Sequence, residues 1–436
     1  MEPAGDALEP PIAAARRRPT RALTAVRSFL SDPGNLLALV LLFALVTRAV
    51  WLWLPQGSLI FDEAYYVNAS RVLLSMDIPE GASYADAEPG LDPNAEHPPL
   101  GKVVIAASIL VFGDGGVGWR LPSLIAGMVA LLALYGIVRA AGGSARLGVL
   151  IVALLALDNL TLVHSRIGTL DMLALAPILV GAWLALRGNP ILAGVALAIG
   201  TLVKLTSGFG LIAVLAIYLI DLLAQRRRDG HLAFADVRPM LLTLSAFIAV
   251  AVAGLWTLDL AFTAHADPWA HLLYMATYGA QLTAPDGPTG IASQPWQWLV
   301  NEVQINYLRV AVNVTSDGNV ISSRPSVDFR GALNPFLIAP AVIAFGFALS
   351  YAMRTGNRLA TWSLVWAAAN YLPFWALVLV NQRIMYLYYF LPVVPALAVA
   401  VALLLRRSGL PRVVSIAAIG AMVIGFLAYF PFRQLP

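Results

Sequence analysis

Long apolar stretches alternate with short polar segments along most of this chain. A helix that crosses the roughly 30 Å of hydrocarbon in a bilayer needs about 20 predominantly apolar residues. The pattern therefore predicts an all-α integral membrane protein with about eleven transmembrane helices. The predicted spans lie near residues 35–54, 119–138, 147–163, 169–186, 190–203, 207–224, 240–259, 333–353, 359–380, 385–405 and 411–430.

One further apolar run, residues 103–112, is too short to span a bilayer. It follows Pro98-Pro99, and proline is tolerated in the first turn of a helix but not in its interior. We therefore expect the prolines to start a helix that lies at the membrane interface. Counting this run as a span would also place Arg226-Arg227-Arg228 on the opposite side of the membrane from Arg16-Arg17-Arg18.

Composition and charge support the membrane assignment. Apolar residues make up 59% of the chain and charged residues 12%, whereas a soluble domain carries about 25% charged residues. The only lysines are Lys102 and Lys204, and the arginines are dispersed between the apolar stretches. Dispersed basic residues indicate membrane topology and argue against nucleic-acid binding. The absence of cysteine excludes disulfides, thiolate zinc sites and cysteine nucleophiles.

The basic residues also favour one orientation. With a cytoplasmic N-terminus, nearly every short basic segment lies in the cytoplasm, as the positive-inside rule requires. The long acidic loops then lie outside a cell membrane that the chain crosses many times. The expected parts are a disordered cytoplasmic N-terminus (1–34), a transmembrane module (35–259) with a catalytic first outer loop (55–118), a second large outer loop (260–332) and C-terminal helices (333–436).

The first outer loop carries two adjacent carboxylates, Asp62 and Glu63, among aromatic residues. A carboxylate near an acceptor hydroxyl can take its proton as a glycosidic bond forms. The plainer alternative is a pair of solvated loop acids. The flanking Phe61, Tyr65 and Tyr66 weaken that alternative, because they predict an amphipathic helix against the bilayer.

Two other outer segments combine polar and aromatic groups. In Glu96-His97-Pro98-Pro99-Leu100-Gly101-Lys102, His97 could bond a substrate, or a metal together with a carboxylate. The alternative is a turn that starts a helix, with a solvated histidine. Trp296, in the second loop, could stack on a sugar or a peptide, or anchor the loop on the membrane.

Single charged residues recur at the outer ends of spans. Arg166 and Asp171 flank a short turn, where Asp171 could orient Arg166 or face a sugar; a local ion pair is the alternative. Lys204 and Arg383 are cations that could hold a lipid phosphate, while extension of both side chains to the headgroups is the alternative. Tyr386 follows Arg383 in an aromatic run.

Together these motifs resemble the protein O-mannosyltransferases, which are polyprenyl-phosphate-mannose-dependent enzymes of the GT-C membrane fold. The resemblance runs from about residue 35 to residue 430, in the same motif order. The motifs are Phe61-Asp62-Glu63, His97-Pro98-Pro99-Leu100-Gly101-Lys102, Asp158-Asn159, Ser165-Arg166 with Leu170-Asp171, Pro295-Trp296-Gln297-Trp298 and Arg383-Ile384-Met385-Tyr386-Leu387-Tyr388-Tyr389.

The resemblance implies a GT-C fold with two interfacial helices in the first outer loop. It implies that Asp62 is the catalytic base of an inverting transfer, with Glu63 beside it in the acidic pair. No nucleotide diphosphate takes part, so a metal is not required, although a divalent cation near Asp62 stays open. The chain departs from the family in residues 289–294, which lack a His-Pro-Tyr, and in Tyr388-Tyr389, where Tyr-His is common. These departures concern the acceptor more than the donor.

We therefore expect an inverting glycosyltransferase that moves a hexose, with mannose favoured, from a polyprenyl phosphate to a Ser or Thr hydroxyl of an exported protein. One alternative acceptor is a glycolipid or a cell-wall glycan. A second alternative is a transporter or lipid flippase, which would place ionisable groups near mid-membrane on several helices. The predicted catalytic residues are Asp62 and Glu63, and the predicted substrate contacts are His97, Lys102, Arg166, Asp171, Lys204, Trp296, Arg383 and Tyr386.

Overall fold

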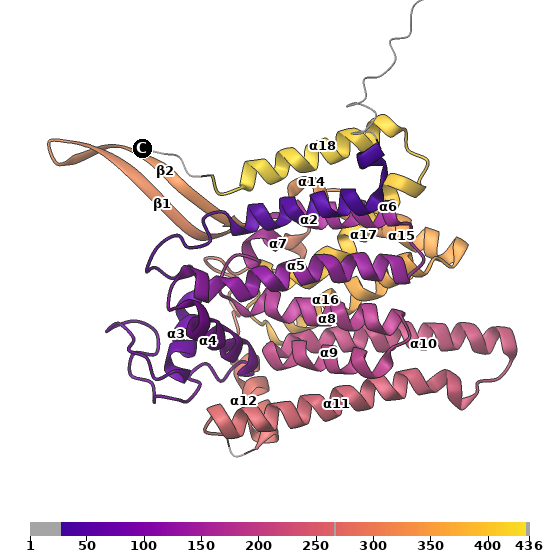
Figure 1. Ribbon diagram of the computed structural model, residues 1–436, viewed down its shortest axis with the longest axis horizontal. Coiled ribbons are helices and arrows are strands. Elements are labelled where there is room, and N and C mark those ends of the chain that lie inside the picture. Colours follow the sequence, from indigo (N-terminus) through magenta and orange to yellow (C-terminus); the bar gives the residue numbers. More distant parts are fainter. Residues whose placement is uncertain (1–27, 266, 433–436) are drawn as a thin grey trace, which may run out of the picture.

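The computed structural model describes residues 28–265 and 267–432 as a bundle of roughly antiparallel helices (Figure 1). Within these residues, six helical segments are long and apolar enough to cross a membrane, by length and composition. They are α5 (Gly116–Ala140), η1 with α10 (Leu205–Asp229), α11 (Phe234–Phe262), α16 (Arg358–Asn381), η2 with α17 (Leu387–Arg407) and α18 (Arg412–Tyr429).

Shorter helices complete the bundle. Each of the eleven predicted apolar stretches contains a helix, although two of them are broken in the middle. The shorter bundle helices are α2 (Pro33–Ala49), α6 (Ala145–Ala156), α7 (Asn159–His164), α8 (Leu170–Leu186), α9 (Pro190–Val203), α14 (Pro335–Ile338) and α15 (Ala341–Thr355).

The break between α6 and α7 has an identifiable cause. The Asp158 side chain caps α7 by accepting a hydrogen bond from the Thr161 amide at 2.8 Å. Its other oxygen accepts one from the Asn334 amide at 3.0 Å, and the Asn159 side chain donates to the Phe426 carbonyl. Asp158 and Asn159 therefore tie distant helices together, as expected of polar groups that pack transmembrane helices.

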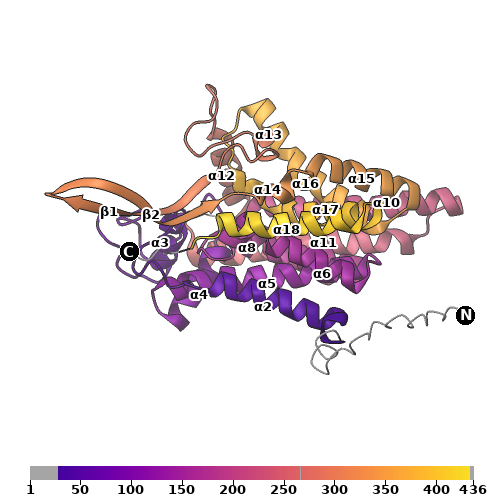
Figure 2. The same cartoon turned by 90° about the horizontal axis from the view of Figure 1, so that it is seen from above.

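The up-and-down course of the helices gives the bundle two different ends. One end carries α3 (Glu63–Leu73), α4 (Leu100–Phe112) and α12 (Pro268–Gln281), and the opposite end carries the turn between α10 and α11 and the start of α2 (Figures 1 and 2). Arg226-Arg227-Arg228 lies in the last turn of α10, at that opposite end. The predicted separation of the basic turn from the first acidic loop is therefore present in the fold.

The first loop packs tightly onto the bundle. As predicted, α4 is a separate helix of 13 residues that begins directly after Pro98-Pro99. It lies against α3, and a small core of Tyr66, Val67, Ile105, Ile109 and Trp119 joins the two helices to α5. Of the predicted disordered segment, residues 1–27 lie outside the described part. Its last residues already belong to α2, which Asp32 caps.

The second loop differs from the all-α expectation. Besides α12 and the short α13 (Pro295–Trp298), it forms an antiparallel hairpin of β1 (Ile305–Ser316) and β2 (Asn319–Gly331). The two-residue turn is Asp317-Gly318, both at positive φ, which matches the twist of hairpin strands. The hairpin projects away from the bundle, beyond α3 (Figure 1), while its base packs into the core through Ile305, Tyr307 and Phe329.

Candidate active site

A buried ion pair fixes the start of α3. The Glu63 carboxylate, fully buried, accepts hydrogen bonds from Arg120 at 2.7 and 2.8 Å. It also accepts from the backbone amides of Ile60 (2.7 Å) and Gly168 (2.8 Å). The Arg120 guanidinium in turn donates to the carbonyls of Leu52, Leu54 and Ser58. Glu63 is thus fully occupied in holding the loop to α5, and the structure gives no support to the catalytic role predicted for it.

Asp62, by contrast, does not use its side chain to hold α3 in place. It is the N-cap residue of α3, yet its side chain makes no capping bond. The preceding Phe61 has φ +53°, an uncommon conformation for an aromatic residue and one often found at functional sites. Burial, and then the charge of Asp171, raises the pKa of Asp62 to about 7, although Lys204 acts in the opposite direction. Such a carboxyl group is well suited to proton transfer at neutral pH.

Asp171 and Lys204 form the charged centre of the site. Asp171 lies in the first turn of α8 and Lys204 directly after α9, and their side chains form an ion pair at 2.6 Å. His164 lies 3.4 Å from the other Asp171 oxygen. The second ring nitrogen of His164 is 2.8 Å from the Tyr307 hydroxyl. A chain of polar contacts therefore runs from Tyr307, at the hairpin base, through His164 and Asp171 to Lys204.

The Lys204 ammonium faces a pocket with aromatic walls. It lies 5.1 Å from the ring centre of Tyr388 and 5.3 Å from that of Tyr389. The pocket is lined by Asp171, Lys204, Thr206, Ser207, Phe209, Asn370, Phe374, Tyr388, Tyr389 and apolar residues of α8 and η2. A cation between aromatic rings in a partly enclosed pocket can hold an anionic headgroup while the rings contact its apolar or sugar portion.

Arg166 does not belong to this centre. The sequence suggested that Asp171 could orient Arg166, but Asp171 pairs with Lys204 and His164. The Arg166 guanidinium donates to the Val50 carbonyl and lies over the Phe329 ring. The predicted pairing is therefore wrong, because Asp171 begins α8 next to Lys204 while Arg166 packs against the hairpin.

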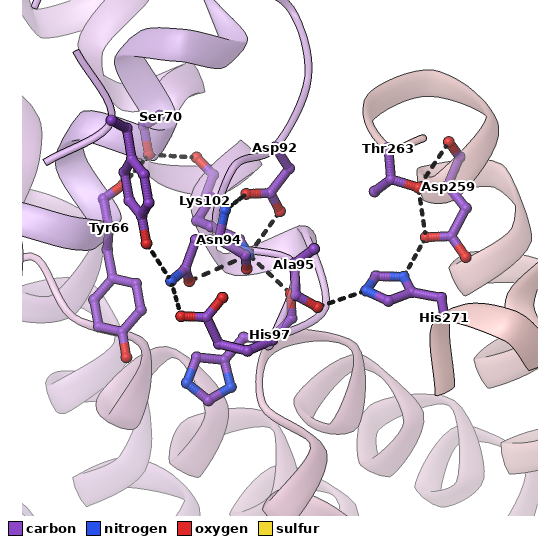
Figure 3. Close-up of polar contacts among 12 residues, drawn as sticks. Tyr66, Ser70, Asp92, Asn94, Ala95, His97, Lys102, Asp259, Thr263 and His271 are labelled. Carbon is purple, nitrogen blue, oxygen red and sulfur yellow. Dashed lines mark hydrogen bonds and ion pairs between the residues drawn. The ribbon is translucent and has the colours of Figure 1, made fainter. Parts of the chain in front are cut away.

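Lys102 also has a different environment from the one expected (Figure 3). Its ammonium is fully buried, pairs with Asp92 at 2.6 Å and donates to the carbonyls of Asn94 and His97. Its backbone carbonyl accepts a bond from Ser70, which joins α3 to α4. Lys102 therefore organises the loop around His97, and no part of its ammonium faces a substrate.

His97 remains a candidate contact. Burial, followed by the charge of Lys204, holds the pKa of His97 well below its ordinary value. The ring is therefore neutral at pH 7 and can donate one hydrogen bond and accept another. Its loop is anchored from α12, where His271 bridges Asp259 (2.6 Å) and the Ala95 carbonyl (2.7 Å) (Figure 3).

The three remaining predicted contacts lie farther along the same end of the bundle. Arg383 donates to the Gly279 carbonyl, which connects the end of α16 to α12. The Tyr386 ring stacks on Tyr388, which lines the lysine pocket. Trp296 is 40% exposed, packs against Trp375 and does not line the lysine pocket.

Part of this chain resembles known proteins in sequence. Residues 96–257 match the family described as dolichyl-phosphate-mannose-protein mannosyltransferase. The polyprenol-phosphate-mannose–protein mannosyltransferase of Corynebacterium glutamicum is 32% identical over 154 residues, which are 35% of this chain and 29% of the relative. The Mycobacterium tuberculosis protein of the same description is 34% identical over 136 residues, which are 30% of this chain and 24% of the relative. The aligned part thus spans less than a third of these relatives.

Solved structures resemble the chain over nearly its whole length. The Saccharomyces cerevisiae Pmt1–Pmt2 complex bound to the sugar donor has a TM-score of 0.68 at 11% identity and covers 94% of this chain and 92% of that one. The chain has the GT-C fold of the protein O-mannosyltransferases. ArnT from Cupriavidus metallidurans bound to undecaprenyl phosphate has the same fold, with a TM-score of 0.56 at 17% identity, covering 93% of this chain and 63% of ArnT.

These structural matches confirm the GT-C fold expected from the motifs. Together with the six apolar helices of membrane-spanning length in the described residues, they support a multi-pass membrane protein. Divalent cations of the Mg²⁺ or Ca²⁺ type need several oxygen ligands. In residues 28–265 and 267–432 no three His, Asp or Glu side chains converge as such a site would need. One Asp171 oxygen already binds Lys204. A divalent cation near Asp62 stays a prediction.

Three residues of this GT-C site received no role from the sequence. Arg120 lies inside a long apolar span, 57 positions after its partner Glu63. His164 ends α7, and Tyr307 lies on a strand in a segment predicted to be a loop. An arginine inside an apolar span was the one usable signal, because a buried charge requires a partner.

The buried ion pair of Glu63 and Arg120, called the clamp below, can be tested by measuring the free energy of unfolding. Replacing Arg120 by Met should lower the free energy of unfolding by about 3–5 kcal/mol, because it leaves a buried carboxylate unpaired. Chemical unfolding in detergent would measure the loss. The matched control is Arg358→Met, which breaks the exposed pair with Asp221 and should cost less than about 1 kcal/mol. Equal effects of the two substitutions would contradict the clamp.

Proposed function

We propose that the chain is an inverting glycosyltransferase that moves mannose from a polyprenyl phosphate to a Ser or Thr hydroxyl of an exported protein. The observation that carries this proposal is the placement of Asp62, with its raised pKa, beside the Asp171–Lys204 pair and the aromatic pocket. A base and a phosphate-binding cation at one end of a GT-C bundle are the two groups that this transfer needs.

The chemistry follows from these positions. The acceptor hydroxyl gives its proton to the Asp62 carboxylate while its oxygen attacks the anomeric carbon of the sugar. The bond from that carbon to the phosphate oxygen breaks on the opposite face, so the configuration inverts. The bonding electrons leave with the polyprenyl phosphate, whose added negative charge is stabilised by Lys204. In this proposal His97, which is close enough to Lys204 to feel its charge, donates a hydrogen bond to the phosphate or the sugar.

A transfer assay with the purified chain tests the function. Polyprenyl-phosphate mannose carrying a radiolabel is mixed with a Ser/Thr-rich peptide, and label in the peptide is expected. If the label enters a lipid or a glycan instead, mass spectrometry of the products assigns the alternative acceptor. If the donor stays intact but crosses the membrane of proteoliposomes, the chain is a transporter or flippase and the proposal fails.

We also propose that the site lies on the extracytoplasmic face and the basic turn in the cytoplasm. The chain contains no cysteine, so single introduced cysteines report topology without background. In intact cells a membrane-impermeant maleimide should label Glu80→Cys, in the first loop, and should label Arg227→Cys only after permeabilisation. Both positions are exposed. The reverse pattern would overturn the orientation.

The raised pKa of Asp62 predicts a pH profile. As a base, Asp62 works only when it is ionised, and its pKa of about 7 means that protonation removes the base as the pH falls below 7. The ratio kcat/KM should therefore fall by about tenfold per pH unit below that point and level off above it, since this ratio reports the free enzyme. Initial rates between pH 5 and 8.5 measure it. A flat profile would show that Asp62 does not titrate as the base.

A further inference from the structure

A second cavity lies beside the base of the hairpin, apart from the lysine pocket. Its walls come from the segment that follows α2, the turn between α7 and α8, both strands and the segment after α18. The lining is apolar except for one charged side chain, Arg166. The lining residues are Trp51, Leu52, Leu54, Pro55, Ile60, Arg166, Leu308, Val310, Val327, Phe329 and Pro431. None of these residues lines the lysine pocket.

Arg166 is a buried cation with unused donors. Its side chain is 7% exposed, and a single guanidinium nitrogen donates, to the Val50 carbonyl. The other two nitrogens, Nε and Nη1, are buried and have no hydrogen-bond partner in the described part of the chain. A buried charge without partners is costly, so such groups normally face an ion or a ligand.

The neighbouring charges do not neutralise Arg166. No carboxylate of residues 28–265 and 267–432 forms an ion pair with it. The charges that act on it most are the cations Arg120 and Arg48, and Arg120 is already matched by Glu63. The cavity therefore has an excess of positive charge within apolar walls, which favours an anion with an apolar attachment.

From this arrangement we infer that the cavity is a second anion site, which takes a phosphate group borne by a membrane lipid. The free Nε and Nη1 of Arg166 lie on different edges of the guanidinium, and each can donate to one anionic oxygen. The cavity measures about 50 Å³; since one water needs roughly 10–15 Å³ on this scale, there is room for a few oxygens. The apolar walls include Leu52 and Leu54, which flank the half-exposed Trp53 in the segment after α2. Such walls suit the part of a lipid that adjoins its headgroup.

The proposal is tested by lipid binding to the full chain in detergent. Phosphatidylglycerol, inorganic phosphate and the zwitterionic phosphatidylcholine are titrated separately, and binding is followed by native mass spectrometry and thermal unfolding. Arg166→Gln should raise the Kd for phosphatidylglycerol at least tenfold, and Arg166→Lys should raise it less. Tight binding of inorganic phosphate as well would identify free phosphate as a second source of the same group.

Controls separate this site from the rest of the protein. Arg330→Gln removes a partly exposed arginine of the same hairpin, paired with Asp328, and should leave the Kd unchanged. Repeating the titrations with Lys204→Gln removes binding at the proposed donor site, so failure of the proposed function would not alter the result. Without lipid, Arg166→Gln should be at least as stable as the unaltered chain, because it removes an unpaired buried charge.

Two results would overturn the inference. One is an equal Kd for phosphatidylglycerol with and without the Arg166 guanidinium. The other is an unchanged lipid Kd together with a raised KM for the acceptor peptide, which would assign the cavity to the acceptor.

Discussion

Replacing Asp62 by Asn is expected to lower the rate of sugar transfer by about 10²–10⁴-fold, the usual contribution of a general base. Asn keeps the size of the side chain but cannot take the proton of the acceptor hydroxyl. The fold should be unaffected, because in the described part of the chain no capping bond or ion pair engages the Asp62 carboxylate. Initial rates at saturating donor and acceptor measure the loss.

The matched control for this substitution is Asp77→Asn, at an exposed position of the same loop. It should retain the full rate, and both variants should unfold at the temperature of the unaltered chain. Turnover that survives in a well-folded Asp62→Asn variant would end the assignment of Asp62 as the base.

Replacing Lys204 by Gln should lower the transfer rate by about 10²–10³-fold, by analogy with the removal of one donor that stabilises developing negative charge. The Lys204 ammonium lies at the aromatic pocket. The other lysine, Lys102, is paired with Asp92 and therefore cannot take its place. The substitution also leaves Asp171 without its ion-pair partner, so part of the loss could come from destabilisation. The double variant Asp171→Asn, Lys204→Gln separates the two effects.

In the double variant no carboxylate is orphaned, so stability should return while the rate stays low. Lys204→Arg keeps the positive charge and should retain more of the rate than Lys204→Gln. A double variant that transfers sugar at the original rate would exclude Lys204 as the phosphate-binding group.

The fold was largely predictable from the sequence, because apolar runs determine where helices form in a membrane. The run 103–112 was predicted correctly as a separate short helix, since its length and the prolines before it can be read directly. The hairpin was missed, although Asp317-Gly318 between segments rich in Val and Ser is a recognisable hairpin turn.

The site was predictable only in part. Asp62 was found because its carboxylate stands in an aromatic setting, and Asp171 and Lys204 because charges are rare in this chain. Their pairing could not be predicted, since they are 33 positions apart on different helices. Lys102 was misjudged for a related reason: its partner Asp92 is an ordinary loop acid until the fold buries both side chains completely.

A structure of the Asp62→Asn variant with bound polyprenyl-phosphate mannose tests the central claim most directly, because the donor should bind without being consumed. The account predicts the phosphate in contact with the Lys204 ammonium, with the residue 62 side chain facing the anomeric carbon from the side opposite the phosphate. A phosphate far from Lys204, or a sugar turned away from residue 62, would contradict it.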